Sequence, residues 1–251
     1  MGPQRKYNGP KNNSTRTMQK FLDAVGEIIT KYGYSGLVIK NIAEVSGLRR
    51  SQLDHHFGNI NNLIETYIRN KDYWVGFTQQ VTELIKQHGG NYGRELAESI
   101  MINQLDYFYQ NREMQQVILW QLCERNPILF RIGEEREQLG ERLFNMTDPH
   151  FHGTDVDIRA VSALVIAGIY HLVLHSQYND SLFCGVDIST DQGMERIKRA
   201  IRLIMSNTYE SARTQKAENS NTQSGRYRAT KTPVRDRRRR SYRPSSQIKK
   251  R

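Results

Sequence analysis

A short polar run near the N-terminus carries side chains that can read the edges of DNA bases. Arg49 and Arg50 can each pair bidentately with guanine, and Gln52 can pair in the same way with adenine. Two histidines follow one helical turn later and can reach base edges or phosphates. The predicted DNA-contacting residues are Lys40, Arg49, Arg50, Ser51, Gln52, His55 and His56.

Such a run reaches bases only if a helix presents it end-on to the major groove. Apolar residues spaced by three or four predict helices over 17–32, 39–46 and 50–57. Gly47 allows a sharp turn between the second and third helices, and Lys40 opens the second, where that helix meets the DNA backbone. The order predicts a helix-turn-helix; a plain three-helix bundle with a solvated polar face is the alternative.

Residues 17–64 resemble the DNA-binding region of the TetR family of bacterial transcription regulators. The resemblance implies a sequence-specific regulator, a repressor, that a small-molecule effector releases from a palindromic operator in double-stranded DNA. It also implies a homodimer formed through the last two helices. The positions that carry the resemblance are Gly33, Tyr34, Ile42, Ala43, Gly47, Leu48, Leu53, His55, His56, Phe57, Leu63 and Ile64.

Three positions depart from the family pattern. Val38 stands where the family usually has threonine, Asp54 where it has tyrosine, and Ile60 where it has lysine. Phosphate contacts supply much of the affinity for DNA, so the motif alone is expected to bind weakly. We expect basic arms to compensate. A second interpretation is an interaction protein that keeps the regulator fold, has lost specific operator reading and binds polyanions through its tail.

The rest of the chain also has a helical pattern. We predict an all-α fold, with an N-terminal three-helix helix-turn-helix domain and a larger helical ligand-binding and dimerisation domain. Four regions follow: a flexible basic arm (1–16), the DNA-binding domain (17–64), the larger domain (65–212) and a disordered basic tail (213–251). The remaining predicted helices cover 59–88, 92–110, 113–124, 127–145, 156–178 and 191–213, with a loop over 146–155.

The positive charge is concentrated in the tail. The chain carries a net charge of +11, yet residues 213–251 hold 14 Lys/Arg against two acids, so residues 1–212 are close to neutral. A cationic tail is attracted to nucleic acid, anionic membranes or acidic proteins.

The larger domain offers two further predicted surfaces. Residues 156–178 are apolar on nearly all sides, which predicts a dimer interface through Val161, Leu164, Val165, Gly168, Ile169, Leu172, Ile201 and Ile204. If the domain holds an effector, it is small and mostly apolar, because the predicted helices offer few inward polar groups. Its candidate pocket residues are Met101, Leu105, Tyr107, Phe108, Trp120, Tyr170 and His171, a stripe that ordinary core packing also explains.

Other functions find little support in the sequence. There is no Gly-rich phosphate loop or nucleophile elbow, so we expect neither an enzyme nor a cofactor. His171 and His175 share a helix face, but no carboxylate or thiolate completes a set of ligands, and no metal is expected. The longest apolar run, residues 160–174, is shorter than a membrane span. Two distant cysteines and the absence of a signal peptide predict a cytoplasmic protein. The resemblance implies that the cytoplasm is bacterial and that the protein is associated with the nucleoid.

Overall fold

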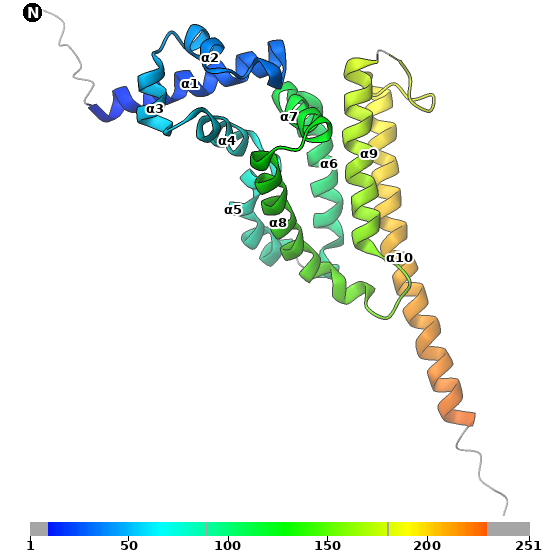
Figure 1. The fold of residues 1–251 in the computed structure, drawn as a ribbon. Helices are drawn as coiled ribbons and strands as arrows, with labels where there is room; N and C mark the ends of the chain where they lie inside the picture. The colour runs from blue at the N-terminus through cyan, green and yellow to red at the C-terminus, as the bar shows by residue number, and fades with distance from the viewer. Residues whose placement is uncertain (1–9, 89, 180, 230–251) are drawn as a thin grey trace, which may run out of the picture.

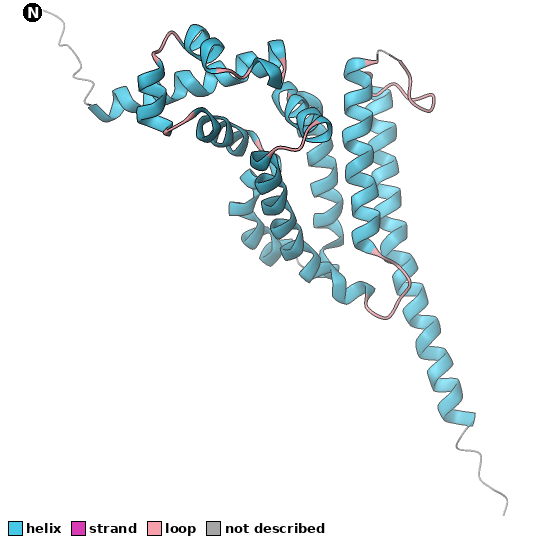
Figure 2. Ribbon diagram, viewed as in Figure 1, coloured by secondary structure: helices cyan, strands magenta, loops and turns pink. Residues whose placement is uncertain are grey.

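The computed structural model describes residues 10–88, 90–179 and 181–229, and this part of the chain is helical with short connections (Figures 1 and 2). The described residues form no β-strand, only one isolated bridge between Phe183 and Val186. The all-α prediction is confirmed. In chain order the helices are α1 (Pro10–Tyr32), η1 (Tyr34–Gly36), α2 (Ile39–Ser46), α3 (Arg50–Phe57), α4 (Ile60–Lys71), α5 (Tyr73–His88), η2 (Gly90–Gly93), α6 (Arg94–Gln110), α7 (Arg112–Cys123), α8 (Pro127–Phe151), α9 (Ile158–Tyr178) and α10 (Asp191–Ala229).

The first four α-helices pack around one apolar core. Phe21 and Ile28 project from one face of α1 and are almost fully buried, as the spacing predicts. Ile42 of α2 and Leu53 of α3 close the core against them. Each such side chain stabilises the module by roughly 1.5–3 kcal/mol on burial.

The turn between α2 and α3 depends on Gly47. Its backbone is left-handed (φ 67°, ψ 21°), and a Cβ there would meet no neighbouring atom. The requirement is therefore one of backbone conformation rather than of space. Asn59 caps α4, since its side chain accepts a hydrogen bond of 2.9 Å from the backbone N–H of Asn62.

The larger body contains α5 to α10. Figure 1 shows α9 and α10 side by side on one flank, and α6 packs against both of them. On the other flank α8 packs against α5. The deepest core residues come from α6, α8, α9 and α10, and include Leu105, Ile132, Val173 and Met205.

Two predicted boundaries inside the body are wrong. The helix expected over 59–88 is divided at Asp72, whose backbone is extended and whose carboxylate accepts bonds from the first N–H groups of α5. The loop expected over 146–155 is mostly helical, because α8 continues to Phe151 with Pro149 inside its last turn. A proline there leaves one backbone bond unmade but does not end the helix.

Both predicted arms are shorter than expected. The prediction of flexible chain is wrong for residues 10–16, which belong to α1, and for 213–229, which continue α10. Polar side chains hold the start of this extension: Gln215 accepts from the N–H of Asp155 at 2.9 Å, and Lys216 donates to the carbonyl of Pro149 at 3.0 Å. The remainder of both predicted arms, residues 1–9 and 230–251, lies outside the described residues.

Candidate nucleic-acid interface and effector cavity

Helix α3 is anchored by its apolar side chains and presents the polar ones outward. Leu53 is 1% exposed and Phe57 is 8% exposed, and the Phe57 ring meets Phe21 of α1 edge-on at 6.1 Å between centroids. The side chains of Arg49, Arg50 and Ser51 lie on the exposed side. The start of α3 is therefore free to enter a groove while its rear is fixed to α1.

The other predicted contact residues lie on or near the same face. Lys40 and His55 are exposed, and His56 is half-buried with its ring 4.9 Å from that of His55. Gln52 is partly committed to local structure, since its Oε1 accepts a 3.1 Å hydrogen bond from the backbone N–H of Arg49. Its Nε2 stays available for an acceptor on a base.

The departures from the family pattern have visible consequences. Val38 begins α2 without a side-chain cap and is 47% exposed, so an apolar side chain stands at a helix start that could have held a phosphate contact. Asp54 pairs with Arg50 at 3.6 Å, with 47% of its side chain exposed. Such an exposed pair is weak, so it does not withhold Arg50 from DNA.

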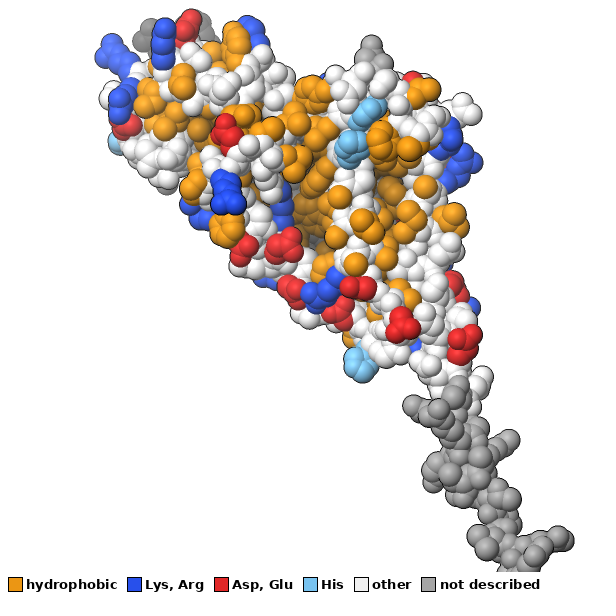
Figure 3. Space-filling view, turned by 45° about the vertical axis from the view of Figure 1, so that its right-hand side comes forward, with side chains coloured by type: hydrophobic (Ala, Val, Ile, Leu, Met, Phe, Trp, Pro, Cys, Tyr) orange, Lys and Arg blue, Asp and Glu red, His pale blue; other side chains and the backbone are white. Residues whose placement is uncertain are grey.

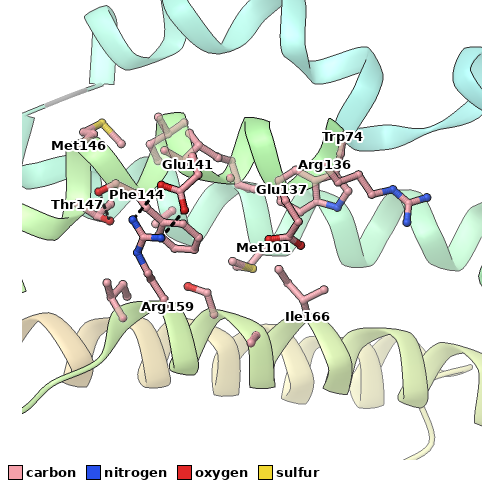
Figure 4. A pocket seen from close by; sticks show the side chains of 18 of the residues that line it. Trp74, Met101, Arg136, Glu137, Glu141, Phe144, Met146, Thr147, Arg159 and Ile166 are labelled. Carbon is pink, nitrogen blue, oxygen red and sulfur yellow. Dashed lines mark hydrogen bonds and ion pairs between the residues drawn. The ribbon is translucent and has the colours of Figure 1, made fainter. Parts of the chain in front are cut away.

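A cavity of about 400 Å³ lies between α8 and α9 (Figure 4). Its walls are mostly apolar, from residues that include Leu96, Ile100, Phe144 and Ile166. Figure 4 shows Trp74 and Arg136 toward one end, and Arg159 with Glu141 and Phe144 toward the other. The size and lining fit a small, largely apolar molecule.

Two of the seven predicted pocket residues line this cavity, Met101 and Tyr170. Leu105 is packed in the core, and Phe108 is buried beside a separate small void. Tyr107 donates its hydroxyl hydrogen to the carbonyl of Lys71.

The last two predicted pocket residues lie elsewhere. The Trp120 ring stacks on Tyr34 of η1 at 5.3 Å, and His171 is exposed on α9. The predicted residues come from α6, α7 and α9, and none comes from α8, which forms one side of the cavity.

Charged residues that the sequence did not single out stand at the outer end of the cavity. Arg159 donates to Asp148 at 2.8 Å and pairs with Glu141, and its guanidinium lies 4.8 Å from the centre of the Phe144 ring. These carboxylates raise the pKa of Arg159 and keep it charged. From the sequence alone, the acidic residues of α8 look like part of a solvent-exposed helix face. Nothing in the neighbouring sequence therefore identifies them as cavity residues.

A buried ion pair lies at the inner end. The carboxylate of Asp72 is 1% exposed and accepts from Nε of Arg136 at 2.9 Å. Burial on its own would lower the pKa of Arg136, but the charge and hydrogen bonds of Asp72 outweigh it and the pKa is raised. The other oxygen of Asp72 accepts from the N–H groups of Trp74 and Val75, each at 3.0 Å.

A second set of ion pairs connects α8 to α4, the helix that follows the helix-turn-helix. Arg131 and Glu135 of α8 pair with Glu65 and Arg69 of α4, and Arg69 also donates to Glu65 at 2.9 Å. Hydrogen bonds from Arg131 and Arg69 lower the pKa of Glu65. Helix α8 therefore both lines the cavity and pairs with α4, which packs on α1 and α3.

The predicted dimer residues divide between the core and the surface. Val165, Ile169 and Ile201 are buried inside the subunit, so the prediction that they lie in a dimer interface is wrong. Leu164 and Ile204 are 76% and 43% exposed. Val161, Gly168 and Leu172 are half-buried, and a Cβ at Gly168 would meet open space.

Leu164 lies on α9 and Ile204 on α10. Figure 3 shows apolar side chains gathered on this flank of the molecule, here called the α9–α10 face. Leu203 adds to it and is 61% exposed. Helix α9 has 21 residues, and a stretch of 18 of them has a mean hydropathy of 1.6, so by length and composition alone it could cross a membrane, as the core helix of a soluble protein also could. Its inner side packs on α6 and α10.

The histidines do not assemble a metal site in the described part of the chain, which holds no group of three or more potential metal-binding side chains. The rings of His171 and His175 lie 5.9 Å apart and both contact Phe183. Nε2 of His150 lies 3.0 Å from the carbonyl oxygen of Tyr209, and His152 is exposed beyond the end of α8.

Comparison with solved structures shows the fold. The fatty acid degradation regulator FadR from Bacillus halodurans aligns with 81% of this chain and 97% of its own, with a TM-score of 0.55 and 14% identity. The transcriptional regulator FadR from Bacillus subtilis, solved in complex with stearoyl-CoA, aligns with 77% of this chain and 98% of its own, with a TM-score of 0.52 and 15% identity. The chain therefore shares the fold of these two proteins, with an N-terminal helix-turn-helix and a helical body. A scan against protein-family models and a search of curated proteins each found no match.

Proposed function

We propose that this chain is a dimeric, sequence-specific DNA-binding regulator of transcription, a repressor whose operator affinity a small, mostly apolar effector lowers. The proposal rests chiefly on one observation. Leu53 and Phe57 fix α3 to α1 while Arg49, Arg50 and Ser51 remain exposed at its start. That is the presentation a reading helix needs in the major groove.

The α9–α10 face supports a second copy of the chain as the partner. Leu164, Leu203 and Ile204 expose large apolar side chains there, which a monomer in water would keep covered. A two-fold dimer through this face places two α3 helices on one DNA duplex. Half-sites centred about 34–36 Å apart, one turn of DNA, and a palindromic operator follow from that symmetry.

Helix α8 supplies a route from the cavity to the DNA-binding helices. Helix α8 can take different positions relative to α4. An effector between α8 and α9 shifts α8 toward the position to which that effector binds more tightly. The ion pairs of Glu65 and Arg69 with α8 pass that displacement to α4, which packs on α1 and α3. Operator affinity then falls because the two α3 helices no longer match the half-sites.

The basic arms supply phosphate attraction that the motif lacks. Helices α1 and α3 are in contact, so the N-terminal basic residues continue from a helix that packs on the reading helix. The extension of α10 leads away from α3 within the subunit (Figure 1). We therefore assign operator-side contacts to the N-terminal arm, with Arg5 and Lys6, and general attraction to polyanions to the tail.

A binding selection on random duplexes tests the proposal. The full chain, at near-physiological salt, is expected to enrich a palindromic consensus. Equal retention of all sequences would refute operator reading and leave the second function, a polyanion-binding interaction protein with the regulator fold. The exposed Asp54 favours that second function, because a carboxylate on this face repels phosphate. Replacing Asp54 by Asn should raise affinity for every duplex if α3 docks as proposed; unchanged affinity contradicts that docking.

A further inference from the structure

The inner end of the cavity holds a buried amide without a partner. Gln104 of α6 is 1% exposed, and neither its Oε1 nor its Nε2 makes a hydrogen bond of normal geometry, although Tyr170 lies close enough for the amide to lower the pKa of its phenol. Buried amides are normally paired, because leaving one unpaired forfeits its bonds to water. Gln115, the other fully buried glutamine of the described residues, donates to the carbonyls of Phe108 and Tyr109 at 2.8 and 3.0 Å.

Gln104 borders a small void next to the main cavity. The void measures about 10 Å³, which is room for one water molecule or one non-hydrogen atom of a ligand. Trp74, Arg136 and Tyr170 line both spaces, so the two meet at these side chains. Figure 4 shows Trp74 and Arg136 together at this end of the cavity.

The surroundings of the void favour an uncharged group. Arg136 is already paired with Asp72, whose second oxygen is taken by backbone N–H groups, so neither charge is free for a ligand. Burial raises the pKa of Tyr170, which keeps its phenol neutral at pH 7. An ionised ligand group would lose its hydration here without gaining a counter-charge.

We propose that this void is the head-group subsite of the effector cavity and takes the hydroxyl group of an otherwise apolar molecule. A hydroxyl can donate to Oε1 of Gln104 and accept from its Nε2–H, which pairs both amide atoms through one oxygen atom. A carboxylate has no hydrogen to donate to Oε1, and an ammonium has no lone pair for Nε2–H. The apolar part of the molecule lies between α8 and α9, against Met101 and Ile166. This inference rests on the proposed function only in taking the cavity for an effector site.

Three probes with one chain length test the subsite. Calorimetric titration of the full chain with 1-decanol, decanoate and decylamine should give the tightest binding for the alcohol, by about tenfold. Gln104→Leu removes the amide at similar volume and should weaken 1-decanol by about tenfold while leaving decanoate unchanged. Gln115→Leu is the matched control, because Gln115 is equally buried but lines neither space; it should bind 1-decanol as the unaltered chain does.

The outcomes separate the subsite from the regulator function. Equal affinity for the three probes, or an alcohol preference that survives Gln104→Leu, overturns the subsite. Melting curves show which variants are folded, and Gln104→Met replaces Gln104→Leu if the latter is not. No binding of any probe, together with a palindromic consensus, refutes the subsite alone. Binding of 1-decanol that depends on Gln104, together with indifference to DNA sequence, refutes the regulator alone.

Discussion

The two buried glutamines should respond in opposite ways to the same substitution. Gln115→Leu loses the bonds to the carbonyls of Phe108 and Tyr109, which close the turn between α6 and α7. At about 0.5–1.5 kcal/mol for each bond, plus the cost of two carbonyls left unpaired, the free energy of unfolding should fall by about 2–3 kcal/mol. Gln104→Leu loses no hydrogen bond of normal geometry and removes a buried amide, so the free energy of unfolding should stay unchanged or rise by about 1 kcal/mol.

Urea unfolding followed by circular dichroism at 25 °C measures both changes. The two variants should differ by about 3 kcal/mol, and the melting temperature of Gln115→Leu should fall by roughly 4–10 °C for a chain of this size. Equal losses in the two variants would refute the reasoning, because Gln104 would then be hydrogen-bonded as firmly as Gln115 is. The alcohol subsite would fall with it.

Four further predictions concern the ion pairs, the dimer and the tail. Asp72→Ala leaves Arg136 buried without its counter-charge and should lower the free energy of unfolding by about 3–5 kcal/mol in urea titrations; adding Arg136→Met should restore part of the loss. Leu164→Glu places a charge on the α9–α10 face and should give the monomer mass in sedimentation velocity, whereas a persistent dimer contradicts this interface. Removing residues 230–251 should make DNA binding less dependent on salt. The slope of the logarithm of the binding constant against the logarithm of the salt concentration should fall in magnitude by about 0.9 for each phosphate that the tail neutralises. An unchanged slope would mean that the tail does not contact the DNA. The pKa of Glu65 is lowered in the folded chain, so the stability that Glu65 contributes is complete above the ordinary value of 4.5 and is lost as the pH falls through the lower folded value. Between about pH 5 and 3, the unaltered chain should therefore lose more stability than the Glu65→Gln variant does. Equal losses would contradict the pairing of Glu65 with the two arginines.

The helix-turn-helix was predictable because its signals are local. Gly47 ends α2 with a left-handed backbone, and Asn59 caps α4 through its own side chain. The apolar residues of α1 and α3 fall at helical spacing and are the ones that are buried. Each of these features depends on residues within a few positions in the sequence, so composition and spacing suffice.

The cavity was not predictable in the same way, because its key residues are paired over long distances. Asp72 divides one predicted helix into two, and its partner Arg136 lies 64 residues away among acids that read as a solvated face. Helix α9 is apolar on nearly all sides, so periodicity could not separate the inward Ile169 from the outward Leu164. Residues 213–229 are polar and read as a tail, yet Gln215 and other side chains attach the start of this segment to backbone groups near residue 155.

The central claim is that the start of α3 touches base edges, and a comparison of two arginine variants tests it most directly. Arg50→Ala and the matched control Arg142→Ala, an exposed arginine of α8, each remove one positive charge. In repeated duplex selections, Arg50→Ala should relax the preference at one symmetric position of the consensus by about 1–3 kcal/mol, and Arg142→Ala should leave every position unchanged. A consensus that is the same for both variants would contradict base reading by α3.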